Sequence, residues 1–212
     1  MNPIVKPNEI ELRSFQIITE ELGERTFPDG VAQVVKRVIH TSADFDYADT
    51  LCFSPGAVEA GKAALAAGAT VVTDTNMALA GVNKTILAGL GGQARCFMAE
   101  PEVAAEAKAR GVTRAVISME HAARLPGPVI FAVGNAPTAL IRLHEMIEAG
   151  ALAPALVIGV PVGFVNVVES KELFLGGKTP YIIARGRKGG SNVAAAIVNA
   201  LLYQMVTREG FE

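Results

Sequence analysis

Five short apolar runs recur along this chain, and helical, Ala-rich segments separate them. The runs cover residues 71–73, 95–98, 129–133, 156–158 and 181–184. They are continuous rather than alternating, as in strands that are covered on both faces. The intervening segments 55–67, 101–110 and 137–149 each begin with Pro and are followed by Gly, and a fourth covers 191–205. This alternation predicts a three-layer α/β/α fold with a mainly parallel sheet.

Two helices are expected before the first strand. Asn8 can cap the first, and its apolar stripe consists of Ile10, Phe15, Ile18 and Leu22. Asp29 can cap the second, whose apolar positions are Val31, Val34, Val35 and Val38. No linker or repeat divides the chain, so residues 1–212 are expected to form one domain.

Composition excludes several classes of function. Nineteen Lys and Arg against 21 Asp and Glu give a net charge of −2, and no long basic run occurs. These numbers argue against a general nucleic-acid binder and against a polybasic membrane patch. The uncharged stretch 151–168 contains two prolines and two glycines, so it predicts a buried strand and turn rather than a membrane span.

The N-terminal residues show no secretory signal pattern. Cys52 and Cys96 lie in apolar, strand-like runs, which favours buried free thiols in a reducing compartment. A cytoplasmic location is therefore expected.

The loops that follow the strands carry the candidate binding residues. In a parallel α/β fold, ligands bind beyond the carboxyl ends of the strands. Here those places hold residues 74–76, 134–138, 159–161 and 185–191, which are polar, glycine-rich and basic at one end. The turn 185–192 lies between a strand and a helix, so it is either an anion site built from backbone N–H groups or a generic turn. This edge suits a ligand that carries negative charge.

His40 is the most informative single residue. On the second helix it points away from the valine face, so it is not a core histidine. It is either an exposed histidine near a helix C-terminus, where the helix dipole favours the cation, or a proton donor beside Arg37, which would bind an anion.

The acidic run 44–49 could bind Mg²⁺ with partners from elsewhere, although a solvated loop is favoured. His121 and His144 have no partner at ligand spacing, so no dedicated metal site is expected.

Five motifs taken together carry a specific resemblance. They are Glu11-Leu-Arg-Ser-Phe15, Arg37-Val-Ile-His40, Gly134-Asn-Ala-Pro-Thr-Ala-Leu140, Gly159-Val-Pro-Val-Gly-Phe-Val165 with Glu169-Ser-Lys171, and Arg185-Gly-Arg-Lys-Gly-Gly-Ser191. In this order, from about Pro7 to Tyr203, the chain resembles the precorrin-8X methylmutase family of cobalamin biosynthesis.

The resemblance implies a methyl shift from C-11 to C-12 of a corrinoid precursor, with no organic cofactor and no metal bound by the protein. It makes His40 the proton donor and places Ser14 and Arg37 at the substrate. It also implies a homodimer, or a larger assembly, with the active site near the subunit interface. Together with the loop pattern, it makes further substrate-binding candidates of Asn135, Thr138, Ser170, Lys171, Arg185, Arg187, Gly190 and Ser191.

The family has a cobalt-using branch and a metal-free branch. Residues 41–49 and 73–77 resemble the cobalt-using branch, in which the cobalt arrives inside the substrate. Two alternatives stay open: a non-catalytic carrier of corrinoid intermediates, which would tolerate loss of His40, and a nucleotide-binding module that uses the turn 185–192.

Overall fold

The computed structural model describes residues 7–207. Within that range the strands form a single sheet of six in the order β1-β6-β5-β4-β2-β3, with β1 antiparallel and every other neighbour parallel. The strands are β1 Leu51–Phe53, β2 Thr70–Thr73, β3 Gln93–Arg95, β4 Val129–Val133, β5 Leu156–Gly159 and β6 Tyr181–Ala184. The helices are α1 Pro7–Leu22, α2 Val31–Ser42, α3 Tyr47–Thr50, α4 Ala57–Ala66, α5 Asn76–Gly81, α6 Lys84–Gly89, α7 Pro101–Arg110, α8 Arg114–Ala122, α9 Pro137–Glu148, α10 Val167–Glu172 and α11 Ser191–Tyr203.

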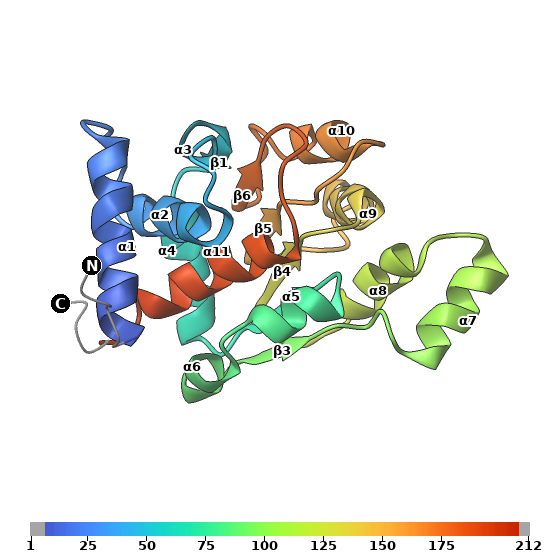
Figure 1. The fold of residues 1–212 in the computed structure, drawn as a ribbon. Helices are drawn as coiled ribbons and strands as arrows, with labels where there is room; N and C mark the ends of the chain where they lie inside the picture. Colours follow the sequence, from blue (N-terminus) through green and yellow to red (C-terminus); the bar gives the residue numbers. More distant parts are fainter. Residues whose placement is uncertain (1–6, 208–212) are drawn as a thin grey trace.

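Alternate residues of the central strands enter two separate cores. Ile130 and Ala132 of β4 pack in a cluster with α1, α2, α4, α5, α6 and α11. Val129, Phe131 and Val133 of the same strand pack with α7, α8 and α9 on the opposite face. Because side chains alternate across a strand, every central residue is buried and the run reads as continuously apolar. The predicted α/β fold with a mainly parallel sheet is therefore confirmed, with helices packed against both faces of the sheet (Figure 1). Among the described residues, the short helix α3 stands before β1 in addition to the two expected helices.

Several predicted elements have the bounds that the structure shows. The predicted runs 129–133 and 181–184 coincide with β4 and β6, and the predicted segment 101–110 coincides with α7. The predicted strand 95–98 is displaced, because β3 lies at the sheet edge and pairs only its residues 93–95 with β2. Phe97 follows the strand and packs into the second core from a loop.

Two expectations for the N-terminal helices are wrong, and a third, the cap by Asn8, rests on a side chain outside the described part of the chain. Ile10 is 50% exposed and does not join the core stripe. Asp29 does not cap α2, because Gly30 occupies that position with a φ of 77° and there is no side-chain capping bond. A Cβ at Gly30 would lie 2.7 Å from Cγ1 of Val58, so glycine lets α2 approach α4.

The uncharged stretch 151–168 contains β5 and the turn that follows it, as predicted. None of the helices within 7–207 has both the length and the apolar character needed to cross a membrane. Cys52 and Cys96 are free, but both are only partly buried, in contrast to the expected full burial.

Helices α2 and α11 bring the N-terminal segment to the carboxyl edge of the sheet. At one end, the Gln204 amide, just after α11, donates to the carbonyl of Gly30, just before α2. At the other end, Lys188, before α11, binds Asp44, which follows α2. The two helices therefore run antiparallel, and the His40 end of α2 lies toward the loop that begins α11.

Candidate active site

His40 lies in the last turn of α2 with its side chain outside the core. Its ring stacks on Phe15 of α1, with ring centroids 5.3 Å apart and an interplanar angle of 25°. Burial against that neighbour lowers the pKa of His40, the Arg37 guanidinium lowers it further, and the Glu11 carboxylate opposes both. The net direction is opposite to the one that the helix dipole favours. His40 is therefore a histidine that gives up its proton more readily than usual.

Arg37 lies one turn before His40, between α1 and α11. Its guanidinium forms a 2.6 Å ion pair with Glu11 and lies over the rings of Phe15 and Tyr203. It also lines a cavity of about 550 Å³ between α1, α2, α4 and α11. An anion reaching Arg37 would thus meet a guanidinium that is already held in place and partly neutralised by Glu11.

Ser14 precedes Phe15 on α1. Its hydroxyl donates to the Ile10 carbonyl one turn earlier, which is the usual bond of a serine inside a helix. Helices α1 and α2 pack together, and Ser14 precedes Phe15, the residue of α1 that contacts both Arg37 and His40.

The acidic run after α2 is bound by a lysine. Lys188 Nζ lies 2.6 Å from carboxylate oxygens of both Asp44 and Asp46. These contacts lower the pKa of Asp44, chiefly through the hydrogen bond from Lys188. They connect the end of α2 to the turn between β6 and α11. The carboxylates of Asp44 and Asp46 therefore bind the Lys188 ammonium.

The turn 185–190 is closed by its own backbone bonds. The Gly190 N–H donates to the Val160 carbonyl at 2.9 Å, and the Gly163 N–H donates to the Arg187 carbonyl at 3.2 Å. The predicted anion site used the N–H groups near Gly190 and Ser191, and a neighbouring loop already binds that of Gly190. For Ser191 the contact stays a prediction. Gly189 has a φ of 159°, and a Cβ there would meet the Val160 carbonyl oxygen, so the two loops touch only because this residue is glycine.

Ser191 begins α11 without capping it. Its hydroxyl lies 2.7 Å from that of Thr75, which follows β2, while Gly190 occupies the cap position. Thr75 caps α5 through a bond from the Ala78 N–H. Ser191 therefore joins the loops after β2 and β6 and does not cap α11.

Ser170 and Lys171 lie inside the protein, which corrects the expectation that their side chains reach the rim. The Ser170 hydroxyl donates to the Val167 carbonyl, and Ser170 has no exposed surface. Lys171 Nζ donates to the carbonyls of Gly186 and Lys188, each at 2.8 Å. Burial lowers the pKa of Lys171 to about 8. Because its ammonium binds two carbonyl groups of the turn, Lys171 stabilises the conformation of the turn from inside the protein.

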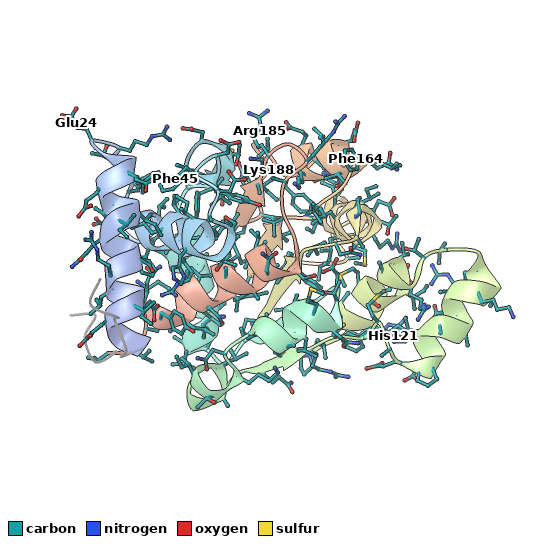
Figure 2. The ribbon with its side chains drawn as sticks, viewed as in Figure 1. Glu24, Phe45, His121, Phe164, Arg185 and Lys188 are labelled. Carbon is teal, nitrogen blue, oxygen red and sulfur yellow. The ribbon has the colours of Figure 1, made fainter. Side chains whose placement is uncertain are left out.

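Arg185 and Arg187 are both exposed on that turn. Arg185 forms a two-pronged ion pair with Glu172 at 3.0 and 3.2 Å. Arg187 places its guanidinium 5.4 Å from the centre of the Phe164 ring. Figure 2 shows Arg185 on the turn and Phe164 farther along the same side of the molecule, near α10. Both cations remain open to solvent at the edge where the sequence predicts a ligand.

Asn135 and Thr138 lie at the start of α9, beside a groove of about 620 Å³ that also includes Met98 and Arg114. Asn135 is exposed, and Thr138 shares a 3.0 Å hydroxyl contact with Thr113. The volume of this groove is within the range of small-molecule sites.

The loop of Asn135 is held by a buried carboxylate that sequence reasoning did not single out. Asp74 has no exposed surface, and its oxygens accept the N–H groups of Gly134, Asn135 and Ala136 at 2.7–2.8 Å. Burial raises the pKa of Asp74, against the opposing effect of these bonds. An acidic residue directly after a buried strand was the available signal. Phe164 was overlooked as well, although an aromatic residue between Gly and Val in a loop is conspicuous.

The structure thus assembles two groups of predicted residues and joins them. Ser14, Arg37 and His40 form one group, and the loops after β2, β4, β5 and β6 form the other. Lys188 bridges them through Asp44 and Asp46. Whether each side chain contacts substrate remains a prediction.

Comparisons with known proteins identify the family. Residues 9–204 match the family model described as precorrin-8X methylmutase. A cobalt-precorrin-8 methylmutase of Priestia megaterium is 45% identical over 197 residues, which is 93% of this chain and 88% of the relative. A precorrin-8X methylmutase of Pseudomonas aeruginosa is 45% identical over 192 residues, 89% of this chain and 91% of the relative.

The fold agrees with a solved structure. The crystal structure of a precorrin-8X methylmutase from Thermus thermophilus superposes with a TM-score of 0.85 at 44% identity, covering 92% of this chain and 94% of that one. The matches extend over the elements that carry His40, Asn135 and the turn 185–191. This chain therefore belongs to the precorrin-8X methylmutase family.

Proposed function

We propose that this protein is an isomerase that moves a methyl group from C-11 to C-12 of a corrinoid precursor, with His40 as the proton donor. Family membership over residues 9–204 supports the reaction class. The observation that carries the residue assignment is the placement of His40 outside the core, with a lowered pKa, beside Arg37. A protonated imidazole can donate to the conjugated ring and make the carbon that carries the methyl more electron-poor.

The remaining residues bind and orient the substrate. A corrinoid precursor is a large apolar ring fringed with carboxylates, which requires apolar surface and cationic or N–H donors around it. The exposed guanidinium groups of Arg185 and Arg187 meet that requirement at the carboxyl edge. Ser14, Asn135, Thr138 and Ser191 present hydroxyl or amide groups on the neighbouring loops and on α1.

We propose a homodimer in which the active site lies near the interface. His40 is exposed in a single chain, and α1 beside it leaves Ile10 50% and Ile17 38% exposed. A second subunit over this face would bury those apolar side chains and exclude water from His40.

We propose the cobalt-containing ring as substrate, on the resemblance of residues 41–49 and 73–77 to that branch. Relatives of both branches are about equally similar to this chain, at 45% identity. The test mixes purified protein with cobalt-precorrin-8 and, separately, with metal-free precorrin-8X and follows the visible spectrum. Conversion of the cobalt form at the higher rate is expected. Faster conversion of the metal-free ring would reverse the branch assignment.

The same experiment with His40→Ala separates an enzyme from a carrier. A carrier binds the ring and tolerates the change, whereas a mutase loses turnover. The nucleotide-binding alternative would have to do without the Gly190 N–H, which already donates to Val160, and protection by ATP or NAD in a thermal-shift screen tests it.

A further inference from the structure

Large apolar side chains are exposed on the loop after β5. Phe164 is 80% exposed, Val165 is 78% exposed and Val162 is 48% exposed. The loop lies at the carboxyl edge of the sheet, in the position where α/β folds bind ligands. A group of exposed apolar side chains at such a position marks a contact surface.

This loop is held firmly in its conformation. It exchanges two backbone hydrogen bonds with the turn after β6, from Gly163 to Arg187 and from Gly190 to Val160. The buried ammonium of Lys171 holds the other side of that turn through two carbonyls. Asn166 ends the loop in the left-handed region, with a φ of 57°. A surface fixed in this way loses little conformational entropy when a ligand binds.

The surface combines an aromatic face with a cation. The Arg187 guanidinium lies 5.4 Å from the centre of the Phe164 ring, and both side chains are exposed. No ion pair of Arg187 with a carboxylate occurs among residues 7–207, whereas its neighbour Arg185 is paired with Glu172. A flat apolar body that carries a carboxylate at its rim complements this pair, by ring contact and by a charge-assisted hydrogen bond.

We propose that Phe164 packs against the face of the corrinoid ring while Arg187 binds one of its peripheral carboxylates, with Lys171 positioning the turn that carries Arg187. This inference rests on the proposed function, since it names where that substrate is held. It adds Phe164 to the proposed substrate-binding residues and gives Arg187 an aromatic neighbour in that role. A second copy of the chain is the competing occupant of the same apolar surface.

The test measures binding of the corrinoid product, cobyrinate, by titration of the visible spectrum. Wild-type protein is measured first, for both conversion of cobalt-precorrin-8 and binding of cobyrinate. Phe164→Ala is expected to weaken binding on the order of tenfold, because one aromatic contact with the ring is lost. Phe164→Leu keeps apolar contact and should lose less. Arg187→Met should weaken binding about tenfold at low salt and much less at high salt.

Two matched variants control for removing surface side chains. Val112→Ala shortens an apolar side chain that is 38% exposed between α7 and α8, and Arg124→Met removes an exposed arginine after α8. Both should bind cobyrinate as wild type does. Sedimentation velocity of every variant measures the oligomeric state in parallel.

The outcomes separate the two proposals. Wild-type protein that neither converts nor binds corrinoids contradicts the proposed function itself. Wild-type binding that persists unchanged in Phe164→Ala and Arg187→Met refutes the ring contact and leaves the function intact. Weakened binding that accompanies dissociation of the assembly in Phe164→Ala assigns the surface to a second copy of the chain and also refutes the contact. Weakened binding at constant oligomeric state supports it.

Discussion

The Arg37 guanidinium and the Glu11 carboxylate form a 2.6 Å ion pair that joins α2 to α1 beside His40. Both charges act on the imidazole, Arg37 by lowering its pKa and Glu11 by raising it. The pKa of the proposed proton donor is therefore lowered chiefly by burial, and it is adjusted further by two residues that are 26 positions apart in the sequence.

Opposite substitutions in this pair should move the pKa of His40 in opposite directions. Removing the positive charge in Arg37→Met should raise it, and removing the negative charge in Glu11→Gln should lower it further. The measurement is an NMR titration of the His40 ring proton. A shift in the same direction for both variants would show that lost packing on Phe15, rather than charge, governs the pKa.

Turnover should depend on protonated His40. Because its pKa lies below the usual 6.5, kcat/KM should fall as pH rises, with a midpoint below 6.5. Arg37→Met should move that midpoint upward. His40→Ala should lose roughly 10²- to 10⁴-fold in rate while its melting temperature stays near wild type, because the side chain lies outside the core. An alanine variant with full activity would remove His40 from the mechanism.

Asp74 should contribute to the position of the loop 134–136. Asp74→Ala leaves three N–H groups without their acceptor, and we expect a loss of about 2–4 kcal/mol in the free energy of unfolding. Asp74→Asn should lose a comparable amount, because its amide NH₂ would oppose N–H donors. Urea unfolding measures both. Asp49→Asn, at an exposed ion pair with Arg25, is the control and should unfold like wild type. Equal stability of all variants would contradict a positioning role.

Lys171 should make stability depend on pH above 8. Burial lowers its pKa to about 8 in the folded protein, against 10.5 for an ordinary lysine. Between these values the unfolded chain binds more protons than the folded one, so this group makes stability rise with pH across that window. Urea midpoints of wild type should therefore increase from pH 8 to 10.5 relative to those of Lys171→Met. Parallel midpoints would mean that the carbonyls of Gly186 and Lys188 keep the ammonium at its ordinary pKa.

Two glycines of the turn 185–190 should respond differently to alanine. At Gly189 the added Cβ would collide with the Val160 carbonyl, so Gly189→Ala should separate the two loops and weaken corrinoid binding. At Gly186 the φ is 77° but nothing lies within 4 Å, so Gly186→Ala should cost only the strain of that conformation, about 1 kcal/mol. Thermal melts and cobyrinate titrations compare the two. Similar behaviour would mean that loop contact at Gly189 is unimportant.

The central strands and the exposed position of His40 could be predicted from the order and spacing of residues alone. Strands β4 and β6 and helix α7 follow from local signals: an apolar run covered on both faces, and Pro and Gly at the helix ends. His40 could be placed outside the core because helical periodicity fixes the angle between it and the valines. The bounds of β3, at the sheet edge, and the N-cap of α2 were predicted less accurately. Segments at an edge or a helix end pack against few other residues, so the local sequence pattern constrains them only weakly.

The way the loops pack against one another fixes which of their polar groups are available to a ligand. Lys171, Ser170 and the Gly190 N–H read as donors in the sequence, but each is already bonded inside the protein. The hydrogen-bond partners of Asp74 and the exposure of Phe164 likewise depend on the fold, although the sequence places both residues in loops that follow strands. The physical reason is that a buried donor or acceptor must find a partner, and here the partners come from loops that are distant in sequence. Which donors remain free is therefore a property of how the loops meet.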